Sequence, residues 1–188
     1  MSDIFDQIIS KENLFWAWEE FRFGKRDRKD VKLFERHLED ELFSLREDLL
    51  NGTYRHGVYQ QFHVFDPKHR IIHKATVRDR LVHHAVYRVL YSLFERSFIF
   101  DSYSCRIGKG THAGVKRLES FARSVSQNFS HPCWGLKFDI KKFFDSVDHG
   151  ILIGILSSQI ESVRTMALLK NIVQSFSKRQ SFGGGVAN

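Results

Sequence analysis

The sequence has few of the residues that are typical of secreted, membrane-spanning or low-complexity proteins. Its two cysteines, Cys105 and Cys133, are too few for a disulfide framework and do not have the spacing of a zinc site. Only two prolines occur, so no proline-rich linker divides the chain. No apolar run approaches the ~18 residues of a membrane-spanning helix, and the first residues lack the pattern of a signal peptide. We therefore expect a protein of a reducing compartment, the cytoplasm, without a membrane partner.

Charge is the main signal in the composition. The chain has 29 lysines and arginines against 22 aspartates and glutamates, which gives a net charge of +7. This surplus fits a polyanionic partner, because cationic side chains that neutralise phosphates drive nucleic-acid binding. A merely basic soluble protein would have the same composition, so charge alone does not identify the partner. The 42% hydrophobic content, with 18 phenylalanines, is enough for a sizeable core.

The N-terminal part is predicted to be helical. Aromatic residues are dense in residues 1–23, and apolar residues recur at helical spacing from Phe34 to Leu49. This spacing predicts one helix from about Asp30 to Leu50, which Asn51-Gly52 would end. The basic turn at 24–29 fits a solvated loop slightly better than a contact with phosphate.

A β-hairpin is predicted next. Residues 58–65 alternate as a strand, the turn Asp66-Pro67-Lys68-His69 follows, and the chain returns through residues 70–74. The tip of this hairpin presents Lys68 and Arg70. Thr76 can then cap a helix from Val77 to about Phe94, whose apolar stripe leaves Arg78 and Arg80 outside it.

A basic loop at 101–111 precedes another predicted helix. Gly108-Lys109-Gly110-Thr111 is similar to part of a phosphate-binding P-loop, but Tyr103 and Ser104 stand where such a loop needs its first glycine. We therefore reject that interpretation. Thr111 is expected to cap the following helix.

The stretch 136–149 carries the most specific pattern. Trp134, Leu136, Phe138 and Ile140 alternate with polar residues or glycine, which predicts a strand over 134–140 in a small antiparallel sheet. Asp139 would lie at its solvent-facing edge. A carboxylate on a half-buried strand needs a cationic partner, either a nearby lysine or a divalent metal ion. Asp148 is a candidate cap for the helix that follows.

This stretch, Leu136-Lys137-Phe138-Asp139-Ile140-Lys141-Lys142-Phe143-Phe144-Asp145-Ser146-Val147-Asp148-His149, resembles the first catalytic motif of reverse transcriptases. The similarity is to the group II intron, retron and diversity-generating retroelement branches. Residues 68–72 with 76–85 are similar to the fingers segment of these enzymes, and residues 102–111 to their second conserved block. Many members have Ile-Pro where this chain has His73-Lys74-Ala75. The resemblance covers roughly residues 30–176.

The resemblance implies an α+β fold of the right-hand polymerase type. Residues 1–130 would form the fingers, with N-terminal helices, the basic β-hairpin and further helices. Residues 131–188 would form a partial palm that carries the first catalytic motif. The chain would be part of an RNA-directed DNA polymerase that joins deoxynucleotides by a two-metal mechanism. Its expected partners are an RNA template, a DNA primer and deoxynucleoside triphosphates, and its oligomeric state stays open.

The resemblance also implies roles for single residues. Asp139 would be the catalytic carboxylate and would bind Mg²⁺ or Mn²⁺ together with the carbonyl of Ile140. Phe144 would lie under the sugar of the incoming nucleotide and exclude a 2′-hydroxyl. Lys68 and Arg70 would hold the triphosphate. The residues expected to contact nucleic acid are Arg78, Arg80, Arg106 and Lys109.

Two expected motifs are missing from the sequence. The Tyr-x-Asp-Asp motif that brings the second carboxylates is absent, and Gly183-Gly184-Gly185 is only a faint echo of the family's glycine-proline motif. We therefore expect a truncated chain that binds nucleic acid and does not polymerise alone. A non-catalytic nucleic-acid-binding protein with a fingers module remains an alternative. A palm polymerase that copies RNA into RNA is a third, against which the bulky Phe144 speaks.

Overall fold

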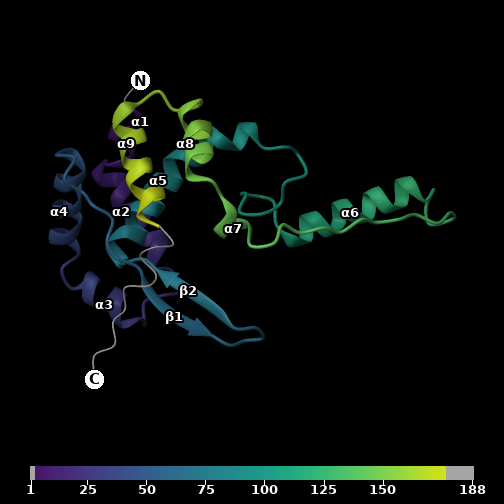
Figure 1. Cartoon of the computed structure of the whole chain (residues 1–188), viewed down its shortest axis with the longest axis horizontal. Coiled ribbons are helices and arrows are strands. Elements are labelled where there is room, and N and C mark those ends of the chain that lie inside the picture. The colour runs from purple at the N-terminus through teal and green to yellow at the C-terminus, as the bar shows by residue number, and fades with distance from the viewer. Residues whose placement is uncertain (1–2, 177–188) are drawn as a thin grey trace. The chain divides into compact units, whose positions relative to one another are not determined.

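The computed structural model describes residues 3–176, with the exception of the side chain of Asp145. The expected glycine motif at 183–185 lies outside these residues. The described residues form an α+β structure with helices and one two-stranded antiparallel sheet (Figure 1). The predicted α+β class is therefore confirmed, whereas the polymerase arrangement and its boundary at residue 130 stay predictions. The chain divides into two compact units, one with residues 1–90 and 147–188 and one with residues 91–146.

The first unit begins with four helices. They are α1 (Ile4–Ile8), α2 (Lys11–Arg22), α3 (Lys29–Glu35) and α4 (Leu38–Leu50). Their core centres on Trp18, which is fully buried and stacks on Phe34 at 5.2 Å between ring centroids. The Asp3 and Ser10 side chains accept hydrogen bonds from the first turns of α1 and α2, as helix caps do.

The predicted single helix over 30–50 is wrong, because the structure breaks it between Glu35 and Leu38. Three consecutive carboxylates, Glu39, Asp40 and Glu41, occupy the first turn of α4. Negative charge is stabilising at the N-terminal end of a helix dipole, so these residues favour a new helix start there. Gly52, at a φ of +68°, follows the last turn of α4, as predicted.

The hairpin and the long helix after it are confirmed. Strands β1 (Gln60–Val64) and β2 (Arg70–Lys74) pair in an antiparallel register, and α5 (Val77–Phe94) follows. Thr76 caps α5, because its Oγ1 accepts a hydrogen bond from the Asp79 N–H at 3.2 Å.

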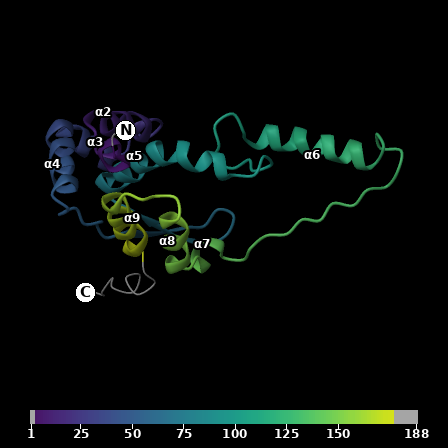
Figure 2. The ribbon, with the colours of Figure 1, turned by 90° about the horizontal axis from the view of Figure 1, so that it is seen from above.

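Two further helices complete the first unit. They are α8 (His149–Ser157) and α9 (Val163–Ser175), which lie next to each other in Figure 2, and α9 also packs against α1. Asp148 caps α8 as predicted, with its Oδ1 2.9 Å from the Ile151 N–H. Among the described residues, no helix is both long and apolar enough to cross a membrane. The cytoplasmic location stays a prediction.

The second unit contains the end of α5, a short 3₁₀ helix η1 (Glu95–Ser97), α6 (Thr111–Val125) and α7 (Phe143–Ser146). Thr111 is the first residue of α6, and the cap position before it is Gly110, with no side-chain hydrogen bond. The prediction that Thr111 caps this helix is therefore wrong.

The predicted strand over 134–140 is not formed. Figure 1 shows this segment as a plain thread, and none of its residues has strand pairing. Trp134 and Leu136 are 97% and 87% exposed instead of facing a core. A strand needs a neighbour to accept and donate backbone hydrogen bonds, and the hairpin is the only sheet among the residues described. Alternation alone could not supply that neighbour.

Candidate functional site

Lys68 and Arg70 lie where the sequence predicted, at the tip of the hairpin. Lys68 is in the turn, and Arg70 is the first residue of β2, opposite Val64. Both side chains are exposed, and neither forms an ion pair with any residue in the described part of the chain. Two cations that are free of carboxylates are available for an anionic ligand. Their role in nucleotide binding stays a prediction.

Arg78 and Arg80 of α5 are paired within the first unit. Arg78 donates to Asp48 at 2.6 Å, and its guanidinium lies 5.8 Å from the Tyr54 ring centre. Arg80 donates to Asp30 at 2.7 Å. Both arginines therefore pair with carboxylates that are distant in the sequence and not with the adjacent Asp79.

Asp30 is shared between Arg80 and the end of the hairpin, since Lys74 Nζ also lies 2.7 Å from it. Burial raises the pKa of Asp30, but the hydrogen bonds from Lys74 and Arg80 outweigh burial and hold the pKa below its usual value. This carboxylate ties α3, β2 and α5 together. Arg80 therefore has a clear structural role, whether or not it also meets phosphate.

Arg106 and Lys109 lie in the second unit and are held by its loop. Arg106 donates to Glu95 through two nitrogens and to the carbonyls of Ile99 and Ser102, and its side chain is only 7% exposed. Lys109 Nζ donates to the carbonyl of Phe100 and lies 4.0 Å from the centre of its ring. A phosphate contact by Arg106 would require this loop to rearrange. The predicted contact with nucleic acid is otherwise untested.

Asp139, Ile140 and Phe144 also lie in the second unit, and all three are exposed. Phe144 is 88% exposed and packs edge-on against Phe143, with ring centroids 5.4 Å apart. No group of three metal-ligating side chains comes together within the described residues. Asp139 and the Ile140 carbonyl are therefore an incomplete donor set for a pair of Mg²⁺ ions, which need several oxygen ligands each.

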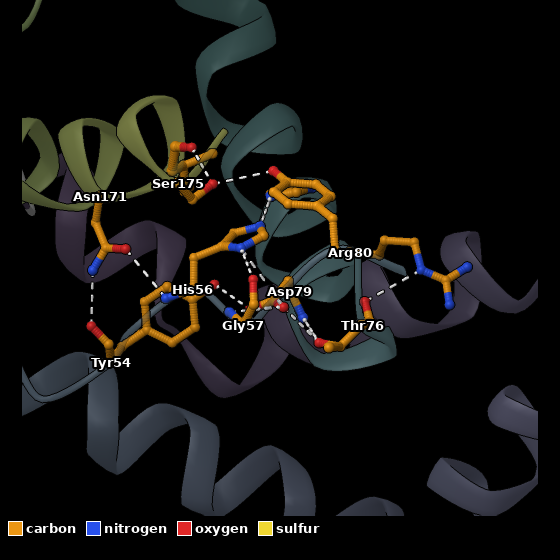
Figure 3. Close-up of polar contacts among 11 residues, drawn as sticks. Tyr54, His56, Gly57, Thr76, Asp79, Arg80, Asn171 and Ser175 are labelled. Atoms are coloured by element: carbon orange, nitrogen blue, oxygen red, sulfur yellow. Dashed lines mark hydrogen bonds and ion pairs between the residues drawn. The ribbon is translucent and has the colours of Figure 1, made fainter. Parts of the chain in front are cut away.

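A buried polar cluster lies at the base of the hairpin, and the sequence did not predict it (Figure 3). Its centre is Asp79, which is 2% exposed. The carboxylate accepts hydrogen bonds from Tyr54 Oη at 2.8 Å, Thr76 Oγ1 at 2.6 Å and the Gly57 N–H at 3.1 Å. Burial raises the pKa of Asp79, but these donors and His56 outweigh burial and leave the pKa below its usual value.

Two histidines extend the cluster from Asp79. His56 Nδ1–H donates to the Gly57 carbonyl at 2.8 Å, so the neutral ring has its lone pair on Nε2. His83 Nε2 lies 3.2 Å from His56 Nε2, so one of these two nitrogens donates a hydrogen bond to the other. Burial lowers the pKa of His83 to about 4, with the charge of His56 as a second cause. The buried imidazole of His83 is therefore neutral at pH 7.

Helix α9 closes the cluster. Asn171 Oδ1 accepts a hydrogen bond from the backbone N–H of His56 at 3.2 Å, and its Nδ2 donates to the Tyr54 carbonyl at 2.9 Å. Position 57 requires glycine because its backbone lies close to Asp79: a Cβ there would be only 2.9 Å from Asp79 Oδ2. The cluster thus joins the segment before β1 to α5 and α9 and fixes the root of the hairpin.

One part of this cluster was visible in the sequence. Thr76 and Asp79 have the spacing of a capping box, in which the third helical residue carries an acceptor close to the cap. The other members are separated from Asp79 by many residues. No local pattern links Tyr54, His56 or Asn171 to it.

Comparison with known proteins gives several relatives whose names refer to introns, and no protein-family model matches the chain. The chain is 33% identical over 98 residues to an uncharacterized 91 kDa protein in the cob intron of Schizosaccharomyces pombe, covering 52% of this chain and 11% of that protein. It is 24% identical over 140 residues to the group II intron-encoded protein LtrA of Lactococcus lactis, covering 73% and 22%.

A third relative is nuclear intron maturase 1, mitochondrial, of Arabidopsis thaliana, which is 24% identical over 102 residues, covering 54% of this chain and 13% of that protein. The predicted resemblance to reverse transcriptases of the group II intron type is thereby confirmed at low identity. The chain spans only 11–22% of the length of these three relatives.

Proposed function

We propose that this chain is part of a reverse transcriptase of the group II intron type, and that the complete enzyme makes DNA on an RNA template. The observation that carries the proposal is the stretch 136–149, in which Asp139 is followed five residues later by Phe144. Similarity to an intron-encoded protein over 140 residues supports it. A net charge of +7 is consistent with RNA and DNA as partners.

Within this function we propose that the chain contributes binding, and that Asp139 contributes one of several carboxylates. Lys68 and Arg70 at the hairpin tip would neutralise the triphosphate of a deoxynucleotide. Mg²⁺ ions, once bound, would supply the charge that phosphoryl transfer needs. The described residues hold too few donors for them, so we expect the ions to bind only when further carboxylates are present.

The test of the catalytic role is primer extension on an RNA template with Mg²⁺ or Mn²⁺. We expect the 188-residue chain to bind the primer–template and not to extend it. A longer protein that contains this chain should extend, and Asp139→Ala should abolish extension. Asp148→Ser is the matched control, because serine keeps the helix cap while it removes a carboxylate nine residues away.

Two results of this assay would be informative against the proposal. If the longer protein keeps its activity with Asp139→Ala, Asp139 is not a catalytic carboxylate. If the 188-residue chain itself extends and Asp139→Ala stops it, another source completes the metal site.

The nucleotide roles of Arg70 and Phe144 have separate tests in the longer protein. Arg70→Ala should raise the Michaelis constant for deoxynucleotides without lowering the melting temperature, because the side chain is exposed. Phe144→Val should admit ribonucleotides, since a smaller side chain leaves room for a 2′-hydroxyl. Unchanged sugar discrimination would exclude Phe144 as the gate.

A non-catalytic nucleic-acid-binding protein is the second candidate. It is favoured by the exposed tip cations and by the incomplete donor set at Asp139. Under this alternative, the longer protein would bind RNA with a steep salt dependence and would not extend a primer under any of these conditions.

A further inference from the structure

One face of the hairpin carries aromatic rings and the other carries Arg70. The antiparallel register pairs His63 with Ile71 and Val64 with Arg70. Side chains alternate between the two faces of a strand, so His63 and Phe65 share one face and Arg70 lies on the opposite one. The aromatic face is therefore distinct from the position proposed for triphosphate binding.

Three rings on this face are nearly parallel. His69, from the turn, lies 5.0 Å from His63 with an angle of 4° between the rings, and 4.8 Å from Phe65 with an angle of 15°. A hydrogen bond of 2.7 Å between His63 Nδ1 and His69 Nε2 fixes the two imidazoles. We call His63, Phe65 and His69 the ring face. Their orientation is set by contacts with one another.

The ring face is open to solvent. Phe65 is 73% exposed, and both histidines are exposed as well. At the other end of the same face, His73 packs against Phe176, the residue after α9, with ring centroids 5.2 Å apart, so this contact covers the root of the hairpin and not its tip. Figure 1 shows the turn of the hairpin clear of the helices of its own unit. Among the described residues of the first unit nothing covers these rings, which leaves a flat aromatic surface for a ligand.

The charge around the ring face favours an anionic ligand. Residues 60–74 contain three basic side chains, Lys68, Arg70 and Lys74, and one acidic side chain, Asp66. Lys74 is engaged with Asp30, but Lys68 and Arg70 remain at the tip. Proteins bind unpaired nucleotides by stacking their bases on aromatic side chains and by placing cations beside their phosphates.

We propose that the ring face binds an unpaired base of a single-stranded nucleic acid by stacking, while Lys68 in the turn meets its backbone. The proposal rests on the proposed function only for the nature of the partner. It does not depend on catalysis or on triphosphate binding by Arg70. A duplex is a poorer partner, because its bases are already stacked on one another.

The test measures binding of the 188-residue chain to a labelled single strand of about 12 nucleotides by fluorescence anisotropy. Phe65→Ala should weaken binding by roughly 5- to 150-fold, because a base stacked on an aromatic side chain contributes that much in comparable proteins. Phe65→Tyr should retain the affinity. Phe62→Ala is the matched control, since Phe62 is exposed on the opposite face of the same strand and should leave binding unchanged.

An abasic strand of the same length separates stacking from charge. It keeps the phosphates and lacks the bases, so Phe65→Ala should have no effect on its affinity. His69→Ala serves as a second variant that removes a different ring. Circular dichroism of each variant establishes that the fold is retained.

Three results would overturn the inference. An equal affinity of wild type and Phe65→Ala for the intact strand would exclude the ring face, while the proposed function would stand. An equal effect of Phe65→Ala on intact and abasic strands would exclude stacking. If the wild-type chain bound no oligonucleotide, the ring face and the proposed binding function of the chain would both fail.

Discussion

The two compact units differ in the burial of their apolar side chains. All the buried apolar side chains found among the described residues lie in the first unit, from Phe5 to Leu90 and from Ile160 to Leu169. In residues 91–146 the apolar side chains are exposed or half-buried, and the largest exposures are those of Trp134, Leu136 and Phe144.

This difference separates two ways of holding a chain together. The first unit has a core in which burial of apolar area provides most of the stabilisation. The second unit is held by charged and aromatic contacts, such as those of Arg106 with Glu95 and of Arg117 with Asp101 at 2.9 Å. Such contacts stabilise less when exposed to water. We therefore expect the first unit to be the more resistant to unfolding.

The largest effect should come from a matched pair of tryptophans. Trp18→Ala should lower the free energy of unfolding by about 3–5 kcal/mol, because a large buried side chain leaves a cavity. Trp134→Ala should change it by less than about 0.5 kcal/mol, because Trp134 is 97% exposed. Chemical denaturation of both variants measures the contrast. A large loss for Trp134→Ala would mean that the second unit has a core of its own.

Acid should weaken the first unit through His83. The pKa of His83 is about 4 in the folded chain and about 6.5 when unfolded, so between these values the unfolded chain binds one more proton. Stability therefore falls as the pH is lowered from 6.5 to 4, by on the order of 3 kcal/mol. His83→Gln should flatten this pH dependence, whereas His112→Gln, at an exposed position, should not.

Asp79 acts in a different pH window. Its pKa is lowered in the fold, so its contribution is present above the unfolded value and is lost only as the pH falls through the folded one. If the His83→Gln variant lost as much stability as the wild type between pH 6.5 and 4, that loss would come from other groups.

Removal of Arg106 should loosen the second unit locally. Arg106→Ala leaves Glu95 and the Ile99 and Ser102 carbonyls without their shared donor, so this loop should open more often. Hydrogen exchange should rise in residues 95–106 and stay unchanged in α2. The control is Arg123→Ala, whose pair with Glu119 is half exposed and should contribute little. Equal exchange in both variants would show that the loop does not depend on Arg106.

The smallest expected contrast concerns two helix starts, one in each unit. Asp148→Ala removes a cap hydrogen bond to Ile151 and should cost about 1 kcal/mol. Thr111→Ala removes no cap hydrogen bond and should cost less than about 0.5 kcal/mol. Urea denaturation of the two variants compares them. A greater loss for Thr111→Ala would restore the role that the sequence suggested.

Local chemistry was readable in the sequence. The hairpin, the exposed tip residues Lys68 and Arg70, the cap of α5 at Thr76 and the cap of α8 at Asp148 all depend on residues within a few positions of one another. The break between α3 and α4 was missed because apolar spacing continued across it. The acidic residues at the start of α4 were present in the sequence, but the spacing of the apolar residues predicted one continuous helix across them.

By itself, the sequence determined the α+β class, the positions of the hairpin and α5, and the similarity to intron-encoded reverse transcriptases. Only the tertiary structure decided which carboxylate each arginine of α5 meets, that Asp79 is buried with two histidines, and that residues 134–140 have no strand partner. The physical reason is how far apart in the sequence the interacting residues lie. Caps, turns and alternation act between near neighbours, whereas ion pairs, buried clusters and sheets join residues that are distant in the chain, and many pairings are compatible with one local pattern.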